Sequence, residues 1–348
     1  MTRIGLTFVA AVSVAVLAAG CGGGSSSPTT TASAGGAGTT TASSPSLKVG
    51  LVTDIGGLND HGFNHLAYLG LQKAHKKFGV EIGVHQSTSA ADYIPNMSSF
   101  AQQGYDLVIA VGFLMYDSVK TVASKFPNTK FMIIDNGWSK GDPSNLEGTL
   151  FHEQEAGYLV GYLAGLLYGS KSVTMSTVGG QDIPPVDRYI AGFQAGTKAA
   201  DPQVKLLNGY SQDFVAQDKC KNLALQQIGQ GSKVVFQVAG GCGLGALDAA
   251  KQKGVWGIGV DADQAYYGPE VLTSAMKRVD VDVLTTIKQV QAGNFRGGTT
   301  YEFDLQNNGV GYGKVSSKVS QSDVAKVNAV EQKIKSGAIT VPTKVAVK

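Results

Sequence analysis

Short apolar runs rich in β-branched residues alternate with amphipathic stretches from Leu47 onward, and this alternation constrains the fold more than any other feature. Each run is followed by a turn that contains glycine or aspartate and then by residues at helical spacing, which is the pattern of parallel βαβ units. The sequence therefore predicts an α/β fold. The expected strands are LKVGLV, VEIGV, YDLVIAV, KFMIID, SVTMSTV, VKLLNGY, KVVFQVA and VWGIGV.

Two series of such units, at about 47–140 and 160–265, are separated by the segment FHEQEAGYLVGYLAGLLYG. This segment is apolar on every side but shorter than the roughly 20 residues of a membrane span, so we expect a buried packing helix. The chain of 348 residues is long enough for two domains. We therefore predict two doubly wound, parallel-sheet lobes. Lobe 1 is assigned 47–150 and about 266–297, and lobe 2 is assigned 151–265 and about 298–345.

The first 21 residues have the composition of an export signal. Arg3 precedes the apolar stretch 4–17, and the small residues AAG lead to Cys21. These residues resemble the bacterial lipobox, although the usual leucine lies one position further out, at Leu17. The resemblance implies a lipoprotein signal peptide at 1–21 and lipidation of Cys21, which would anchor the protein to the extracytoplasmic face of the cell membrane. An ordinary secretory cleavage is the alternative.

Residues 22–46 are rich in Gly, Ser and Thr and contain no large apolar side chain, so we expect a disordered tether. Cys220 and Cys242 then remain as an even pair in an oxidising compartment. They form either a disulfide or two buried thiols, and their spacing does not decide between these. The net charge of +3, without a Lys/Arg tract, argues against a nucleic-acid partner.

In doubly wound sheets, ligands bind beyond the carboxyl ends of the strands. The stretch TDIGGLNDHGF lies at the end of the first expected strand. Within it, Asp54 and Asp60 could form a general acid/base pair, but the position of Asp60 favours a cap on the following helix. His61 and His65 could share a helical face as metal ligands, yet no HExxH motif or histidine cluster accompanies them. We therefore expect no metal.

The stretch QVAGGCGLGALDAA at 237–250 fits G-x-G-x-x-A after a strand, as in dinucleotide-binding proteins. It follows the seventh expected strand of the body instead of the first, and nicotinamide cofactors are not found outside the cell. We therefore expect these glycines to allow close approach of a ligand to the backbone, without a cofactor. No GxSxG or GxxxxGK[ST] motif occurs, and we predict that the protein is not an enzyme.

What remains is a set of aromatic and charged residues at strand ends. Aromatic rings provide stacking surfaces, and carboxylates accept hydrogen bonds from hydroxyl or ring N–H groups. Together they indicate a planar, polyhydroxylated ligand such as a nucleoside, with a sugar as the simpler alternative. The set comprises Phe63, Phe113, Tyr116, Trp138, Phe214, Asp54, Asp117, Asp261 and Lys277.

The chain from about 47 to 314 resembles the basic membrane protein family of ABC-transporter lipoproteins, the purine nucleoside receptors. The resemblance implies a type I periplasmic binding protein fold, in which three crossovers join two lobes that close on the ligand. The resemblance also implies two partners, a purine nucleoside (guanosine, inosine or adenosine) and an ABC permease. It further implies that the binding protein is a monomer. The matching blocks are TDIGGLNDHGFN, AVGFLMYDS, FHEQEAGYLVGYLAG, VGGQDIPPVDRYIAGFQAG, FQVAGGCGLGALDAAKQKGVWGIGVDADQ and LTSAMKRVDV.

The same resemblance implies roles for individual residues. The purine would stack between Phe63 and Phe214, and Asp54 and Asp117 would bind its N–H groups. The ribose and backbone contacts would come from Asp261, Lys277, Gly240 and Gly241, and Asn64 and Phe113 would complete the site.

Two departures from the family pattern leave alternatives open. The run YSQDFVAQDKC around Phe214 differs from the family's usual run, and Gly62 stands where the family often has a polar residue. The alternatives are a protein that binds another small ligand, such as a sugar or an autoinducer, and an exported nucleoside hydrolase.

Overall fold

Two six-stranded sheets form the framework of the computed structural model, which describes residues 46–169 and 172–348. The first sheet has the strand order β11-β5-β4-β3-β1-β2, and its neighbouring strands run parallel. Its strands are β1 (Lys48–Thr53), β2 (Glu81–His85), β3 (Leu107–Val111), β4 (Lys130–Ile134), β5 (Leu146–Phe151) and β11 (Thr300–Phe303).

The second sheet repeats this order as β12-β10-β9-β8-β6-β7, and only its edge strand β12 runs antiparallel, against β10. Its strands are β6 (Thr174–Gly179), β7 (Lys205–Tyr210), β8 (Ser232–Val238), β9 (Trp256–Asp261), β10 (Val271–Lys277) and β12 (Val310–Tyr312). The eight strands expected from the sequence are all present, and the α/β prediction is confirmed.

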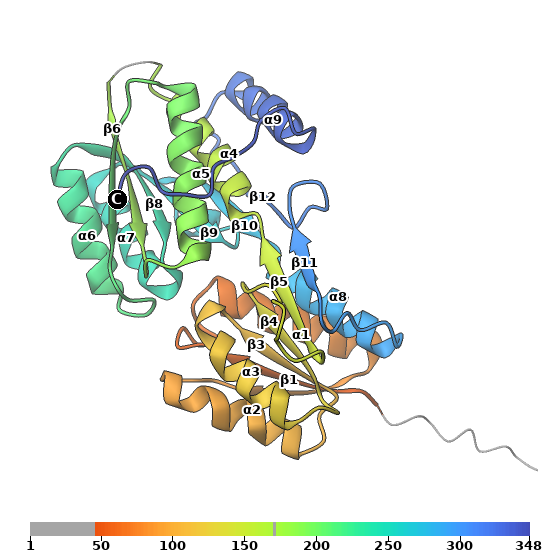
Figure 1. The fold of residues 1–348 in the computed structure, drawn as a ribbon. Coiled ribbons are helices and arrows are strands. Elements are labelled where there is room, and N and C mark those ends of the chain that lie inside the picture. Colours follow the sequence, from red (N-terminus) through yellow and green to blue (C-terminus); the bar gives the residue numbers. More distant parts are fainter. Residues whose placement is uncertain (1–45, 170–171) are drawn as a thin grey trace, which may run out of the picture. The chain divides into compact units, whose positions relative to one another are not determined.

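Helices cover both faces of each sheet (Figure 1). On the first sheet, α1 and α8 pack on one face and α2 and α3 on the other. On the second sheet, α4 and α5 cover one face and α6 and α7 the other, while α9 packs against α4. The helices are α1 (Phe63–Phe78), α2 (Tyr93–Gln102), α3 (Tyr116–Lys125), α4 (Glu153–Leu166), α5 (Pro184–Ala200), α6 (Gln217–Gly229), α7 (Gly240–Lys253), α8 (Val279–Gln291) and α9 (Gln321–Lys335).

The segment expected to be a buried packing helix is α4, which lies against α5. Glycines allow the two helices to approach at backbone distance: a Cβ atom on Gly157 would lie 2.2 Å from the Tyr189 carbonyl oxygen, and one on Gly192 would lie 2.0 Å from that of Gln154. Any larger residue there would separate the helices. Among residues 46–169 and 172–348, no helix has both the length and the hydropathy required to span a bilayer.

The chain passes between the two sheets three times, after β5, after β10 and after β11. These crossings revise the expected lobe boundaries. Strand β10 pairs with β9 in the second sheet and β11 pairs with β5 in the first, so 266–277 belongs to lobe 2 and 298–303 to lobe 1. Strand β10 of the second sheet ends at Lys277, and the chain then crosses to the first sheet, where α8 packs on α1.

A disulfide joins Cys220 of α6 to Cys242 of α7, with Cα atoms 5.6 Å apart. This resolves the choice between a disulfide and two free thiols. The predicted signal peptide at 1–21, Cys21 and all but the last residue of the tether at 22–46 lie outside the described residues.

Candidate ligand-binding site

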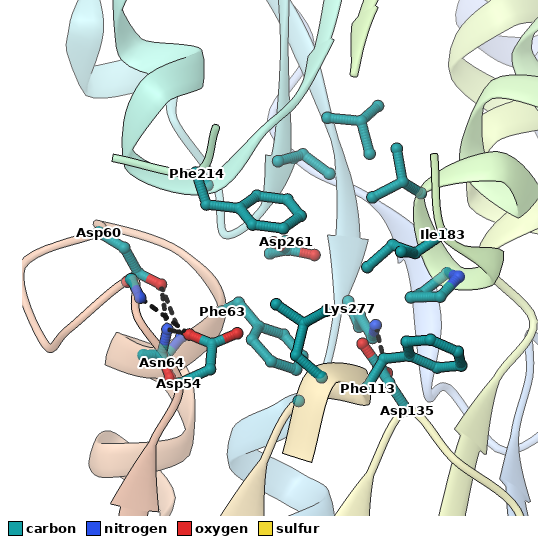
Figure 2. Close-up of a pocket in the computed structure, with 18 of the residues that line it drawn as sticks. Asp54, Asp60, Phe63, Asn64, Phe113, Asp135, Ile183, Phe214, Asp261 and Lys277 are labelled. Atoms are coloured by element: carbon teal, nitrogen blue, oxygen red, sulfur yellow. Dashed lines mark hydrogen bonds and ion pairs between the residues drawn. The ribbon is translucent and has the colours of Figure 1, made fainter. Parts of the chain in front are cut away.

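A pocket lies at the carboxyl ends of the strands of both sheets, where the doubly wound pattern predicts a ligand (Figure 2). Lobe 1 provides the ends of β1, β3 and β4 and the start of α1. Lobe 2 provides the start of α5, the loop after β7, the start of α7 and the ends of β9 and β10. The lining residues are Asp54, Gly56, Asp60, Phe63, Asn64, Gly112, Phe113, Leu114, Asp135, Ile183, Pro185, Val186, Tyr189, Phe214, Val238, Gly240, Gly241, Val260, Asp261 and Lys277.

Asp60 caps the first turn of α1, as the sequence predicted. Its carboxylate accepts hydrogen bonds from the backbone N–H groups of Gly62 at 3.0 Å, Asn64 at 2.7 Å and His65 at 3.0 Å. These bonds satisfy donors that a helix start would otherwise leave unpaired. The cap therefore fixes the orientation of Phe63, the first residue of α1.

Asp54 follows β1 and is buried. Its Oδ1 atom accepts hydrogen bonds from the Gly56 backbone N–H at 3.0 Å and from Asn64 Nδ2 at 2.8 Å. Burial raises the pKa of Asp54 to about 6, although these two donors oppose the shift. The Oδ2 atom lies beside Gly112, where a Cβ atom would come within 2.8 Å of it, and no residue of the described chain hydrogen-bonds to it. An acceptor is thus left for a ligand.

Phe63 and Phe214 bring one aromatic ring from each lobe to the pocket, and Figure 2 shows them on opposite sides of its central space. The Phe214 ring packs against Gly180, where a Cβ atom would lie 2.2 Å from ring atom Cε1. Only glycine at position 180 leaves room for the ring in this position. The two rings therefore offer two faces to a planar ligand.

Lys277, at the end of β10, is the centre of a buried ion network. Its Nζ atom lies 2.6 Å from Asp135 Oδ1, at the end of β4, and 2.9 Å from Glu153 Oε1, at the start of α4. Arg188 contacts the other Glu153 oxygen at 2.6 Å. Burial alone would lower the pKa of Lys277, but the carboxylates of Asp135, Glu153 and Asp261 raise it, so the ammonium stays charged.

Asp261 ends β9 in the left-handed backbone region, with φ of 62°, and Asp135 follows β4 with φ of 73°. Such backbone conformations are rare for residues other than glycine, and strained residues of this kind cluster at ligand sites. Tyr189 donates a hydrogen bond to Asp261 Oδ1 at 3.1 Å. Burial raises the pKa of Asp261 to about 7, although nearby Lys277 opposes the shift.

The structure brings nine of the ten ligand-binding residues expected from the sequence to this pocket. The exception is Asp117, which does not line the pocket, and its role in binding stays a prediction. The short 3₁₀ turn Phe113–Met115 follows β3 and leads into α3, whose first turn presents Asp117 to solvent.

Sequence reasoning missed three functional candidates: Asp135, Glu153 and Tyr189. Asp135 ends an expected strand and satisfies the rule that ligands bind beyond strand ends, but the sequence gives no reason to assign it a role in the site. Glu153 is an acid in the polar first turn of a helix that is otherwise apolar and buried, a pattern that indicates a buried ion pair. Tyr189 has no such signal, because only the packing of α5 on the second sheet brings it to Asp261.

The other motifs have structural roles. A Cβ atom on Gly243 would lie 1.7 Å from Gln237 Oε1, and one on Gly245 would lie 1.9 Å from the Gln217 carbonyl oxygen, so these two glycines allow close packing of α7. The His65 ring lies 3.3 Å from the Leu58 carbonyl oxygen. Within the described part of the chain, no group of three or more His, Cys, Asp or Glu side chains is arranged to hold a metal ion.

Comparison with known proteins agrees with this geometry. The model of the ABC transporter substrate-binding protein PnrA-like family matches residues 47–344. The chain is 33% identical to the ABC transporter nucleoside-binding protein BmpA of Lactococcus lactis, over 86% of this chain and 90% of that protein. It is 36% identical to a CD4+ T-cell-stimulating antigen of Listeria monocytogenes, over 87% and 90%.

Solved structures of other proteins share this fold over most of the chain. An ABC transporter solute-binding protein from Aeropyrum pernix superposes with a TM-score of 0.78 at 28% identity, covering 85% of this chain and 93% of that one. Another from Conexibacter woesei gives a TM-score of 0.69 at 26% identity, covering 86% and 99%. Fold, pocket and family match agree: this chain belongs to the PnrA-like family of ABC transporter substrate-binding proteins.

Proposed function

We propose that this substrate-binding protein captures purine nucleosides between its lobes and delivers them to an ABC importer. The observation that carries the proposal is the pair of aromatic rings, Phe63 and Phe214, with buried carboxylates on either side. Stacking adds about 0.5–1.5 kcal/mol per aromatic pair beyond burial. A sugar would use the carboxylates but has no aromatic plane to stack between the two rings. The name of the Lactococcus lactis relative, a nucleoside-binding protein, supports the same ligand class.

The carboxylates divide between the two parts of a nucleoside. Asp54, whose Oδ2 has no partner within the described chain, would accept a ring or exocyclic N–H of the base. Asp261, Lys277 and Asp135 would hold the ribose hydroxyls. Hydrogen bonds to charged groups contribute about 1.5–3 kcal/mol each, so two or three of them suffice to select a nucleoside over a free base.

Binding and closure are coupled in this proposal. A ligand that touches Phe63 in lobe 1 and Phe214 in lobe 2 has a higher affinity for the closed arrangement and therefore shifts the equilibrium toward it. The permease would then recognise the closed form. The protein would be held near the permease by lipid on Cys21, as the homologues named lipoproteins support. Mass spectrometry of the mature N-terminus tests that anchor.

A thermal-shift panel of nucleosides, free bases and pentoses tests the ligand class. Guanosine, inosine or adenosine should raise the melting temperature in a concentration-dependent way, because a ligand that binds only the folded state stabilises it. Stabilisation by pentoses without stabilisation by nucleosides would overturn the proposal in favour of a sugar or autoinducer receptor. Incubation with inosine followed by chromatography tests the hydrolase alternative, since release of free base would contradict a binding-only role.

A further inference from the structure

The loop that carries Phe214 into the pocket rests on the first turn of α7. The backbone N–H of Cys242 donates a hydrogen bond to the Phe214 carbonyl oxygen at 3.0 Å. Cβ atoms on Gly240 or Gly241 would each lie 3.4 Å from the same oxygen, so the two backbones are in direct contact. A displacement of this turn would therefore displace Phe214.

The same loop is also fixed to the start of α6. Asp213 Oδ1 accepts hydrogen bonds from the backbone N–H groups of Val215 at 2.8 Å and Ala216 at 3.0 Å, and Asp213 Oδ2 pairs with Lys219 at 2.7 Å. Helix α6 begins at Gln217, three residues after Phe214. The ring thus lies on a short loop between two helix starts.

The disulfide connects these two supports, because Cys220 lies in the first turns of α6 and Cys242 in the first turn of α7. Both side chains are fully buried. We infer that the Cys220–Cys242 disulfide is a positioning element for Phe214, which holds the two helix starts together so that the ring keeps its place in the pocket. The inference rests on the proposed function only for the identity of the ligand, since the position of Phe214 is a property of the free protein.

The double substitution Cys220→Ala/Cys242→Ala tests this role, with Val327→Ala as the matched control. Val327 is buried on α9, and its truncation lowers stability without touching the loop or the pocket. The first measurement is hydrogen exchange in the ligand-free protein, followed in peptides that cover 211–217 and the amide of position 242. We expect exchange there to become about tenfold faster in the double variant and to stay unchanged in the control.

The second measurement is guanosine affinity by calorimetry. Loss of a fixed ring should weaken binding about three- to tenfold in the double variant, which corresponds to about one stacking contact, and leave the control within twofold of the wild type. If the double variant does not fold, Cys220→Val/Cys242→Ala, which keeps more apolar volume, takes its place in both measurements.

The inference is overturned if exchange in 211–217 and guanosine affinity both match the control while the melting temperature falls, because the disulfide would then stabilise the fold alone. Unchanged exchange with weakened binding would also contradict it, since the loop would not have moved. If the wild type binds no nucleoside, the proposed ligand is wrong, and the exchange result by itself still decides whether the disulfide positions Phe214.

Discussion

Replacing Lys277 by methionine should destabilise the protein far more than the loss of a surface charge. Lys277 is 2% exposed and lies beside the carboxylates of Asp135 and Glu153 at 2.6 and 2.9 Å. Methionine has a similar length and is apolar, so it fills the space and removes only the charge. Asp135 would then remain buried without its paired cation, and Glu153 would keep only Arg188.

Removing one partner of a buried ion pair costs about 3–5 kcal/mol, because the remaining charge stays desolvated. A chain of this size loses roughly 2 °C of melting temperature per kcal/mol, so we expect a decrease of roughly 6–10 °C. The matched control is Lys326→Met on α9, whose ion pair with Asp323 has a lysine side chain 52% exposed. Exposed pairs contribute about 0–1 kcal/mol, so this variant should be nearly unchanged.

The pH dependence gives an independent check. Burial already raises the pKa of Asp135 and raises that of Asp261 to about 7, and removal of Lys277, whose charge opposes both shifts, should raise these pKa values further. An acid of this kind binds more protons in the folded state, so its destabilising effect is absent at low pH and grows as the pH rises through the folded pKa. The deficit relative to the wild type should therefore be smaller at pH 5 than at pH 8. The assay is thermal unfolding followed by circular dichroism at both values. A decrease no larger than that of Lys326→Met, or a deficit independent of pH, would refute the reasoning.

Three further predictions concern the pocket and the first crossing between the sheets, which His152 follows directly after β5. Phe63→Ala should weaken nucleoside binding at least about tenfold by calorimetry, because it removes one stacking face and its burial, and unchanged affinity would remove the stacking role. Gly112→Ala should weaken binding more than Gly104→Ala, since both have positive φ but only the former places a Cβ atom 2.8 Å from Asp54 Oδ2; equal losses would indicate backbone strain alone. The pKa of His152 is raised to about 9, chiefly by hydrogen bonds to two glutamates. His152 should therefore contribute stability that is complete below about pH 6.5 and lost as the pH rises through 9. In the His152→Gln variant, the free energy of unfolding should change less with pH over that range than in the wild type.

The fold was accessible from the sequence because parallel sheets bury both faces of their strands, and such strands read as continuous apolar runs. Strand β3, LVIAV, is fully buried and was expected from its composition. Strand β5, LEGTLF, was missed because Glu147 interrupts the run; its charge is buried only because Arg296, far along the chain, pairs with it at 2.5 Å. Long-range ion pairs of this kind leave no local signal.

In the site too, residues with a local sequence signal were predicted, and residues that depend on long-range contacts were not. Asp54 and Phe63 were accessible because a strand end and a helix cap are local features. Asp117 lies exposed in the first turn of α3, after a 3₁₀ turn whose three residues cannot be read from composition. Asp135 follows a strand of the first sheet and Lys277 ends a strand of the second, so the ion pair between them depends on tertiary structure.

The proposed capture of purine nucleosides is tested most directly by isothermal titration calorimetry with guanosine, inosine, adenosine and ribose. After each titration, chromatography of the protein–ligand mixture shows whether free base has been released. Binding of at least one nucleoside with a stoichiometry of one per chain, no release of free base and no measurable binding of ribose is the result predicted here. Ribose binding without nucleoside binding, or conversion of the nucleoside to its base, would contradict the proposal that this protein captures purine nucleosides for import.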